Sequence, residues 1–229
     1  MPLMKKLARA VSHYDGASIG ATLRSRRLRP LLSMIGAVFA EHGRVDIIDI
    51  GGTRAYWTLV SRQYLEQHNV RITIVNPAPP RAGPVESRFR HVIADGCDLS
   101  MFSDNAFHIA HSNSVIEHVG DWERMVRFAR ELARVAPRYF VQTPNYWFPI
   151  EPHCMTPFIH YLPKPIRIWL VLHFDLGHWR KANSVDAAVR QVESARLLNE
   201  SMFHALFKEA RIIPERLLLL KKSFVAVRA

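Results

Sequence analysis

The sequence has 229 residues, 48% of them hydrophobic and 22% charged, with a formal net charge of +11. This length supports one sizeable core, and the two cysteines, Cys97 and Cys154, are too few for the disulfide framework of a small secreted domain. The basic residues are spread out and are not interleaved with aromatics in an RNA-binding pattern, so the charge indicates either a solvated basic surface or an anionic partner. Nucleic acid is the less favoured partner, and a cytoplasmic protein is expected.

The first 42 residues are expected to be helical. Apolar residues between Leu3 and Val11 fall on one face of a helix that either packs on the core or lies on a membrane surface. A peripheral contact with the inner face of the membrane therefore stays open. Proline suits the first turn of a helix, so a second helix is predicted from Pro30 to His42. The longest apolar run, residues 166–174, is far shorter than the roughly 20 residues that span a bilayer.

Residues 45–50 are predicted to form a buried parallel strand, because their apolar side chains can cover both faces of the chain. The strand ends at Gly51 and Gly52, which permit a tight turn and close approach of a ligand. A helix over 54–67 should follow, and its N-terminus would present free N–H groups to an anionic group. Asp49, at the carboxyl end of the strand, is placed to meet the cationic part of the same ligand.

Strands and helices alternate through the rest of the chain, which is typical of a doubly wound α/β sheet. The predicted elements are strands over 70–75, 89–94, 107–112 and 138–142, a turn or short helix over 99–102, and helices over 121–136, 184–199 and 201–210. Two final strands, 214–220 and 223–228, are close enough in sequence to form a hairpin.

Residues 143–183 interrupt this alternation and are rich in proline, histidine and aromatic residues. A long loop with one short helix over 166–174 is predicted. Long insertions in compact domains commonly act as lids or binding loops. The chain is therefore divided as one domain over 1–229, with a helical segment (1–42), a cofactor-binding core (43–145 and 205–229) and an inserted lid (146–204).

Polar residues follow the strands at their carboxyl ends, where open α/β sheets bind ligands. Asp49, Asn76 and Asp95 each stand at such an end, and the segment 112–118 follows a fourth strand. A nucleoside needs a partner for its ribose hydroxyls, an acceptor for its exocyclic amine and close backbone approach. Asn76, Asp95 and the glycine pair can supply these three contacts.

These motifs resemble those of class I S-adenosylmethionine-dependent methyltransferases. The similarity is carried by Asp49-Ile-Gly-Gly, by Asp95 with the loop that leads to Phe107, and by Ser114-Val-Ile-Glu-His-Val119. The terminal hairpin also agrees, because the seventh strand of that family is antiparallel. The resemblance implies a Rossmann-like, seven-stranded methyltransferase sheet with S-adenosyl-L-methionine as cofactor.

The resemblance also implies a role for each residue of the motifs. Asp49, Gly51 and Gly52, followed by Thr53, would hold the methionine end and the sulfonium side of the cofactor. The remaining cofactor contacts would be made by Asn76 to the ribose, Asp95 to the adenine amine, Gly96 and Cys97 to the adenine face, and Asn113 and Ser114 beside the transferred methyl group.

A hydroxyl or amine acceptor also needs a general base, and His118, Glu151 and His153 are the candidates. Each could instead have a purely structural role. The spacing of His153, His160, His173 and His178 matches no zinc pattern, so these histidines are interpreted as loop packing and no metal is expected.

The favoured function is methyl transfer to a small-molecule, glycan or lipid-linked acceptor, with oxygen as the expected methylated atom. The aromatic and basic lid favours a partly apolar acceptor with anionic groups. An RNA or protein methyltransferase is an alternative. A non-catalytic protein of the same fold is another, since Gly-Gly-Thr replaces three spaced glycines.

Overall fold

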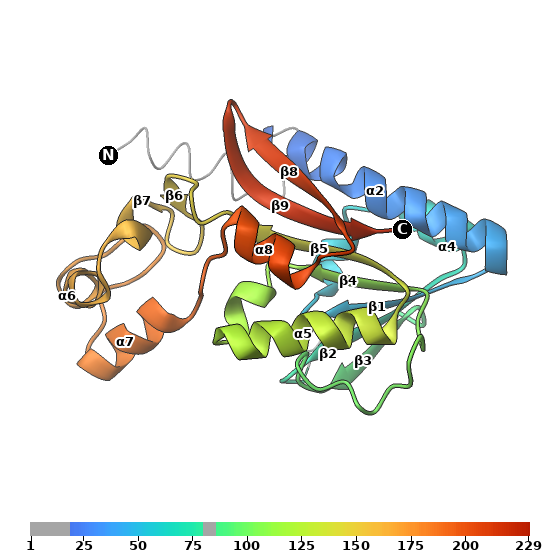
Figure 1. Cartoon of the computed structure of the whole chain (residues 1–229), viewed down its shortest axis with the longest axis horizontal. Helices are drawn as coiled ribbons and strands as arrows, with labels where there is room; N and C mark the ends of the chain where they lie inside the picture. The colour runs from blue at the N-terminus through green and yellow to red at the C-terminus, as the bar shows by residue number, and fades with distance from the viewer. Residues whose placement is uncertain (1–18, 80–85) are drawn as a thin grey trace.

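The protein is built around a seven-stranded sheet, seen in a computed structural model that describes residues 19–79 and 86–229 (Figure 1). The strand order is β3-β2-β1-β4-β5-β9-β8. The parallel strands are β1 (Val45–Ile50), β2 (Val70–Asn76), β3 (Phe89–Ile93), β4 (Ile109–Asn113) and β5 (Arg138–Pro144). β9 (Leu220–Arg228) pairs antiparallel with β5 and with β8 (Arg211–Leu217). The predicted α/β fold with an antiparallel last strand is confirmed.

Helices cover both faces of the sheet, which is why β1 is apolar on both sides. Val45, Ile47, Ile48 and Ile50 are each at most 1% exposed. On one face the sheet packs against α2 (Ile19–His42), α3 (Arg54–Trp57) and α4 (Arg62–Gln67), and on the other against α5 (Trp122–Val135) and α8 (Glu200–Leu206).

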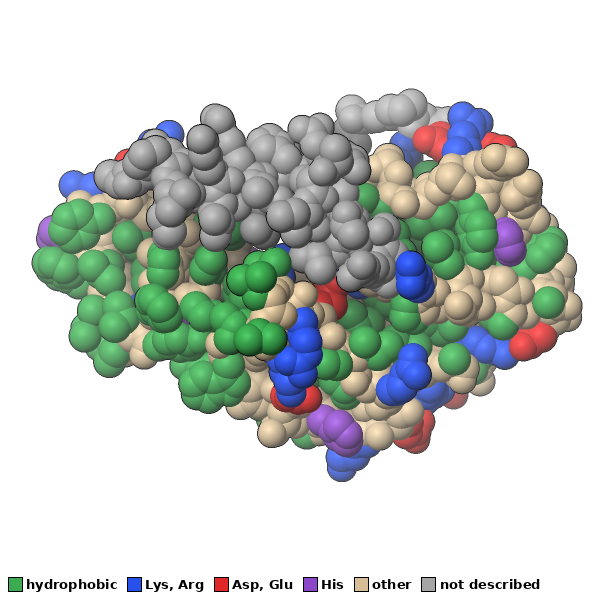
Figure 2. Space-filling view, turned by 90° about the horizontal axis from the view of Figure 1, so that it is seen from above, with side chains coloured by type: hydrophobic (Ala, Val, Ile, Leu, Met, Phe, Trp, Pro, Cys, Tyr) green, Lys and Arg blue, Asp and Glu red, His purple; other side chains and the backbone are tan. Residues whose placement is uncertain are grey.

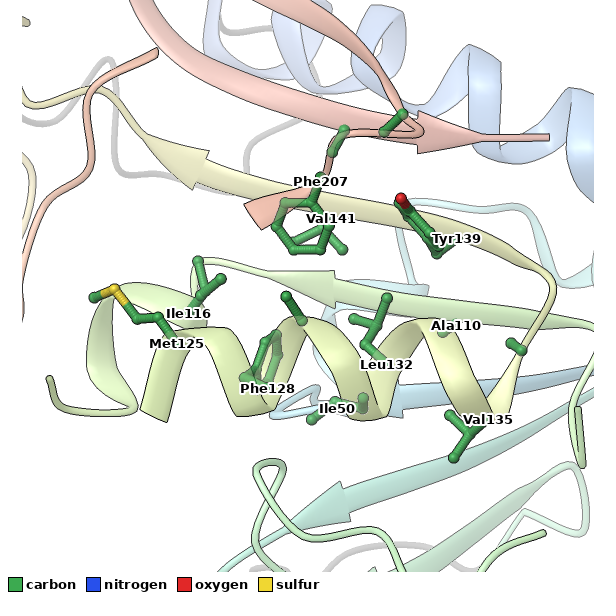
Figure 3. Close-up of a cluster of buried hydrophobic side chains, with 14 of the residues drawn as sticks. Ile50, Ala110, Ile116, Met125, Phe128, Leu132, Val135, Tyr139, Val141 and Phe207 are labelled. Carbon is green, nitrogen blue, oxygen red and sulfur yellow. The ribbon is translucent and has the colours of Figure 1, made fainter. Parts of the chain in front are cut away.

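The sequence pattern of α5 determines which of its faces packs against the sheet. Its apolar residues recur every three or four positions, so Met125, Phe128, Leu132 and Val135 share one face and are fully buried against the sheet (Figure 3). Asp121 caps the helix by accepting a hydrogen bond from the backbone N–H of Arg124. The prediction of a helix over 121–136 is confirmed.

The helix α2 differs from the prediction, since it begins at Ile19 and contains Pro30 in its interior. The proline costs one backbone hydrogen bond, but its fixed φ is helical, and buried residues continue the apolar face on both sides of it. Leu28 and Leu31 are at most 3% exposed. The predicted helical pattern between Leu3 and Val11 lies outside the described residues.

The predicted helix over 54–67 is wrong in one respect, because it is two short helices, α3 and α4. Ser61 accepts a hydrogen bond from the backbone N–H of Tyr64 and starts α4 as a separate helix. Trp57 at the end of α3 and Val60 in the connection to α4 are both buried. The apolar spacing that predicted a continuous helix therefore reflects residues that pack around a bend.

The insertion after β5 forms a lobe at one end of the molecule (Figure 1). Its elements are β6 (Ile150–Glu151), β7 (Thr156–Pro157), the 3-10 helix η2 (Ile159–Tyr161), α6 (Lys164–His173) and α7 (Val185–Glu193). The predicted short helix is confirmed as α6. Within the described residues, no helix is both long and apolar enough to cross a bilayer.

The helices predicted over 184–199 and 201–210 both extend further than the observed helices α7 and α8. The helix α7 ends at Glu193, and the backbone of the following residues pairs with other segments instead of continuing the helix. Arg196 N–H donates to the carbonyl of Glu117 at 2.7 Å, and the carbonyl of Leu198 accepts from Tyr146 N–H at 2.9 Å. This segment brings the carbonyl of Ser194 beside the end of β4.

The final hairpin turns earlier than predicted. β8 ends at Leu217 and the chain reverses at Leu218 and Leu219, which are 90% and 89% exposed. Leu218 adopts a φ of 56°, a left-handed conformation that a leucine in a strand would not have. A run of four leucines reads as a strand from its composition, and only the pairing of β8 with β9 places the turn inside it.

Candidate functional site

The carboxyl ends of β1, β2 and β4 meet at the turn of Gly51 and Gly52. Gly51 adopts a φ of 73°, and a Cβ there would lie 2.4 Å from a methyl group of Val115, so only glycine fits. Its N–H donates to the carbonyl of Val75 at 2.7 Å. Asn76 donates from Nδ2 to the carbonyl of Gly52 at 2.9 Å. The predicted cofactor residues of these loops are thus in contact.

The side chain of Asp49 packs against this glycine turn. It is fully buried, and its carboxylate accepts hydrogen bonds from Trp57 Nε1 at 2.7 Å and from His111 Nδ1 at 2.6 Å. A Cβ on Gly52 would lie 1.7 Å from Asp49 Oδ2. The sequence predicts a direct contact between Asp49 and the ligand, whereas the structure commits both carboxylate oxygens to other side chains. Its visible role is to fix the glycine turn.

Asp95 stands in the loop after β3, next to the end of β1. Its oxygens accept from Cys97 N–H at 2.9 Å and from Arg124 Nη2 at 2.6 Å. Burial alone would raise the pKa of Asp95, but these two hydrogen bonds lower it, so the group is a carboxylate at neutral pH. The side chain is 46% exposed and can still receive an amine. Gly96 packs so closely on Ile50 that a Cβ would lie 2.7 Å from it.

Residues after β4 complete this edge of the sheet. Asn113 Oδ1 accepts from Arg27 Nη1 at 3.0 Å, and Ser114 Oγ donates to Gln142 Oε1 at 2.8 Å. Arg27 also pairs with Glu215 at 2.7 Å, so α2 and β8 both reach this end of β4. Arg27 and Arg124 have no sequence signal of their own, because they act through contacts between distant segments.

A cavity of about 950 Å³ opens beside the glycine turn. Gly52, Thr53 and Asn76 line it, together with residues of α3, α4 and β3. Thr53 also starts α3, since its hydroxyl accepts from Tyr56 N–H. Asp95, Asn113 and Ser114 are not among the lining residues, so the predicted cofactor contacts are divided between this cavity and the loops beyond β1.

The three predicted catalytic residues form one hydrogen-bonded array. Glu151 Oε1 lies 2.6 Å from His153 Nδ1, and His153 Nε2 lies 3.1 Å from His118 Nε2. His118 Nδ1 lies 2.7 Å from the carbonyl of Ser194. The sequence treats these residues as alternatives, and the structure brings them together although they come from two segments more than 30 residues apart.

The environment sets the charge of this array. Burial lowers the pKa of His118. Burial would also lower the pKa of His153, but the hydrogen bond and charge of Glu151 outweigh it and raise that pKa. Burial would raise the pKa of Glu151, but the hydrogen bond from His153 is the first of several contacts that together lower it. A carboxylate beside an imidazole stabilises its protonated form, so the array is suited to accept a proton.

Glu117 belongs to the same cluster, although the motif Ser114–Val119 that contains it predicts no role for it. It is 1% exposed, accepts from Thr143 Oγ1 at 3.0 Å through Oε2, and has no hydrogen-bond partner at Oε1 among the described residues. Burial raises its pKa to about 7. The signal in the sequence was its place beside His118 in a segment that follows a buried strand.

The other lid histidines contact backbone carbonyls. His160 Nε2 lies 2.9 Å from the carbonyl of Tyr146, and His173 Nδ1 lies 2.7 Å from that of Trp169. These contacts agree with the interpretation of both residues as loop packing.

Both thiols are expected to be unreactive in the folded protein. Burial raises the pKa of Cys97 to about 11 and that of Cys154 to about 12, so little thiolate is present at neutral pH. Iodoacetamide at pH 8 should label each at least about 10-fold more slowly than it labels the denatured chain, because an ordinary thiol has a pKa of about 8.5. Mass spectrometry gives both rates. Equal rates in folded and denatured protein would contradict the burial of these side chains.

No protein-family model and no curated protein matches the sequence. The chain is similar in structure to an S-adenosylmethionine-dependent methyltransferase of Methanosarcina mazei, with 13% identity, coverage of 80% of this chain and 91% of that one, and a TM-score of 0.46. It is also similar to the 1,6-didemethyltoxoflavin N1-methyltransferase of Burkholderia thailandensis with bound S-adenosylhomocysteine, with 14% identity, 98% and 85% coverage, and a TM-score of 0.49.

A third similar structure is a putative O-methyltransferase of Nostoc punctiforme, with 11% identity, a TM-score of 0.44, and coverage of 91% of this chain but 58% of that one. All three structures share 14% identity or less with this chain, at TM-scores below 0.5.

Proposed function

We propose that this protein is an S-adenosylmethionine-dependent methyltransferase that methylates a hydroxyl group of a small-molecule, glycan or lipid-linked acceptor. The observation that carries the proposal is the arrangement at one edge of the sheet. A glycine turn in contact with Asn76, a carboxylate at Asp95 and a proton-accepting imidazole array follow neighbouring strands. The first two suit a nucleoside and the third suits an acceptor that loses a proton.

The array supplies the proton transfer that O-methylation needs. The acceptor oxygen attacks the methyl carbon in line with the carbon–sulfur bond, that bond breaks, and the sulfonium becomes a neutral thioether. The hydroxyl proton passes to an imidazole of the His118–His153 pair. Glu151, 2.6 Å from His153 Nδ1, stabilises the positive charge that the pair then carries.

The lid supports an acceptor that is partly apolar and partly anionic. A cavity of about 720 Å³ in the lid is lined by aromatic residues, by Glu151 and by the cationic side chains of Lys164, Arg167 and Arg196. Arg167 Nε is buried and has no hydrogen-bond partner in the part of the chain that the structure describes. A phosphate or carboxylate of the acceptor could accept from it.

The lid surface also carries apolar side chains toward solvent (Figure 2). Trp147, Phe158 and Trp169 are each more than half exposed. Such a surface suits a lipid-linked acceptor or peripheral contact with a membrane.

The cofactor assignment is tested by isothermal titration with S-adenosylhomocysteine. The protein is expected to bind it, and Asp95→Ala is expected to raise Kd at least about 10-fold, because a hydrogen bond to a charged group contributes roughly 1.5–3 kcal/mol. Asp98→Ala is the matched control: Asp98 is an exposed carboxylate three residues further on and should leave Kd unchanged. Absence of binding at millimolar ligand would reject the enzyme and favour a non-catalytic protein of this fold.

A further inference from the structure

The two imidazoles of the array are held in a defined tautomer when neutral. His153 Nδ1 lies 2.6 Å from the carboxylate of Glu151, which can only accept, so this nitrogen carries the hydrogen. His118 Nδ1 lies 2.7 Å from the carbonyl of Ser194 and must also donate. In both rings the lone pair is therefore left on Nε2.

The two nitrogens that carry these lone pairs lie close together. The Nε2 atoms of His118 and His153 are 3.1 Å apart. Two acceptors at this distance repel each other unless a cation or a proton lies between them. Two ligands at roughly 2.0–2.1 Å from one tetrahedral ion stand about 3.3 Å apart, which is close to the spacing observed.

Glu117 adds a third ligand to this point. A carboxylate oxygen of Glu117 and one nitrogen from each of the two imidazoles lie within 4.8 Å of one another. Glu117 is 1% exposed, and within residues 19–79 and 86–229 its Oε1 has no hydrogen-bond partner. A buried carboxylate oxygen without a partner is costly, and coordination to a cation removes that cost.

From this geometry we propose that Glu117, His118 and His153 bind a divalent transition-metal ion of the zinc class. Two imidazoles and a carboxylate are a known ligand set for such ions, whereas Mg²⁺ and Ca²⁺ prefer oxygen ligands alone. Glu151 and the carbonyl of Ser194 are the outer contacts that orient the two rings. The sequence-based expectation of no metal rested on the spacing of His153, His160, His173 and His178. It did not consider Glu117 and His118 as ligands.

Three protein ligands leave a coordination position open, and His118 is exposed, so this position can be reached from solvent. With the ion bound, both Nε2 lone pairs coordinate it and neither imidazole can take the hydroxyl proton. If the proposed methyl transfer holds, the ion would replace the imidazole pair in this role, because a zinc-class ion lowers the pKa of a bound hydroxyl, whose proton then passes to solvent. Metal binding itself does not depend on that activity, and the experiment is done without a methyl donor.

Tag-free, chelator-treated protein is titrated with Co²⁺, and its visible absorption spectrum is recorded. One equivalent should bind and produce the bands of a low-coordinate site, Zn²⁺ should displace it, and Mg²⁺ should not. Zn²⁺ should also raise the melting temperature of the unaltered protein, since it binds the folded state. This second readout does not depend on any variant being folded.

The variants Glu117→Gln, His118→Asn and His153→Gln should each weaken Co²⁺ binding by at least about 100-fold. Glu151→Gln should weaken it about 10–100-fold without removing a ligand. His178→Asn, at an exposed lid histidine, is the matched control and should bind as the unaltered protein does.

Absence of a saturable spectrum, or equal binding by the His153 and His178 variants, would overturn the site. A shared proton between the two rings that persists in excess Zn²⁺, seen in the ¹⁵N spectrum of the imidazoles, would overturn it as well. None of these three results affects the cofactor titration, so the two proposals fail separately.

Discussion

Replacing Gly52 by alanine is expected to destabilise the protein by about 2–6 kcal/mol, because each of the two buried hydrogen bonds of Asp49 costs about 1–3 kcal/mol when its partner is left unsatisfied. The new Cβ would lie 1.7 Å from Asp49 Oδ2. Asp49 cannot move away cheaply, because it is fully buried and accepts hydrogen bonds from Trp57 and His111. Either those bonds break or the glycine turn shifts. The same change should abolish measurable binding of S-adenosylhomocysteine, since the turn also contacts Asn76.

Gly36→Ala is the matched control for this substitution. Gly36 lies in α2, and among the described residues outside its own helix an added Cβ would meet Tyr64 OH at 3.8 Å, an ordinary contact. Alanine in a helix interior is favoured over glycine by about 0.5–1 kcal/mol, so this variant should be slightly more stable. Urea unfolding measures both free energies. A Gly52→Ala variant within about 1 kcal/mol of the unaltered protein would show that Asp49 is free to reorient.

The strand ends could be predicted because their signals are local. Apolar runs that stop at glycine or at a polar residue mark where a buried strand leaves the sheet, and parallel strands all end at one edge. For that reason Gly51, Asn76 and Asp95 could be placed near one another without a structure. The prediction needed no knowledge of side-chain contacts.

The supporting contacts could not be predicted, because they join residues far apart in sequence. Asp49 is held by His111, which is 62 residues away, and Asp95 by Arg124, which is 29 residues away. From the sequence alone, Asp49 and Asp95 are each interpreted as a carboxylate at a strand end that is free to bind a ligand. Glu117 was missed for a related reason: its burial depends on packing beneath Thr143, and no spacing within the sequence reveals it.

The arrangement of the three catalytic candidates could be predicted only in part. Their residue types and their place in the chain pointed to the acceptor side of the sheet, but their order did not show that they touch. The contact depends on the end of α7 at Glu193, because the carbonyl of the next residue, Ser194, orients His118. A helix was predicted there, and a helix would have used that carbonyl for its own hydrogen bonds. The helix predicted over these residues therefore excluded the contact between the Ser194 carbonyl and His118.

Replacing His153 by glutamine is expected to lower the rate of methyl transfer by about 100-fold or more, within the range attributed to general acid–base groups. His153 is the central member of the array, in contact with both Glu151 and His118. Glutamine keeps a polar side chain of similar length but cannot accept a proton and pass its charge to Glu151. The acceptor is first found by screening lipid, glycan and quinone pools, and the rate is followed as formation of S-adenosylhomocysteine.

His178→Asn controls for the loss of a lid histidine, since His178 is exposed and lies in the same lobe. Its rate should stay within about 2-fold of that of the unaltered protein, because surface substitutions away from special features have small effects. The affinity of His153→Gln for S-adenosylhomocysteine is measured beside the rate. A residue that only supported the cofactor site would lower affinity and rate together, whereas one that serves the acceptor lowers the rate alone. Loss of transfer with unchanged cofactor affinity would therefore place the array on the acceptor side of the reaction.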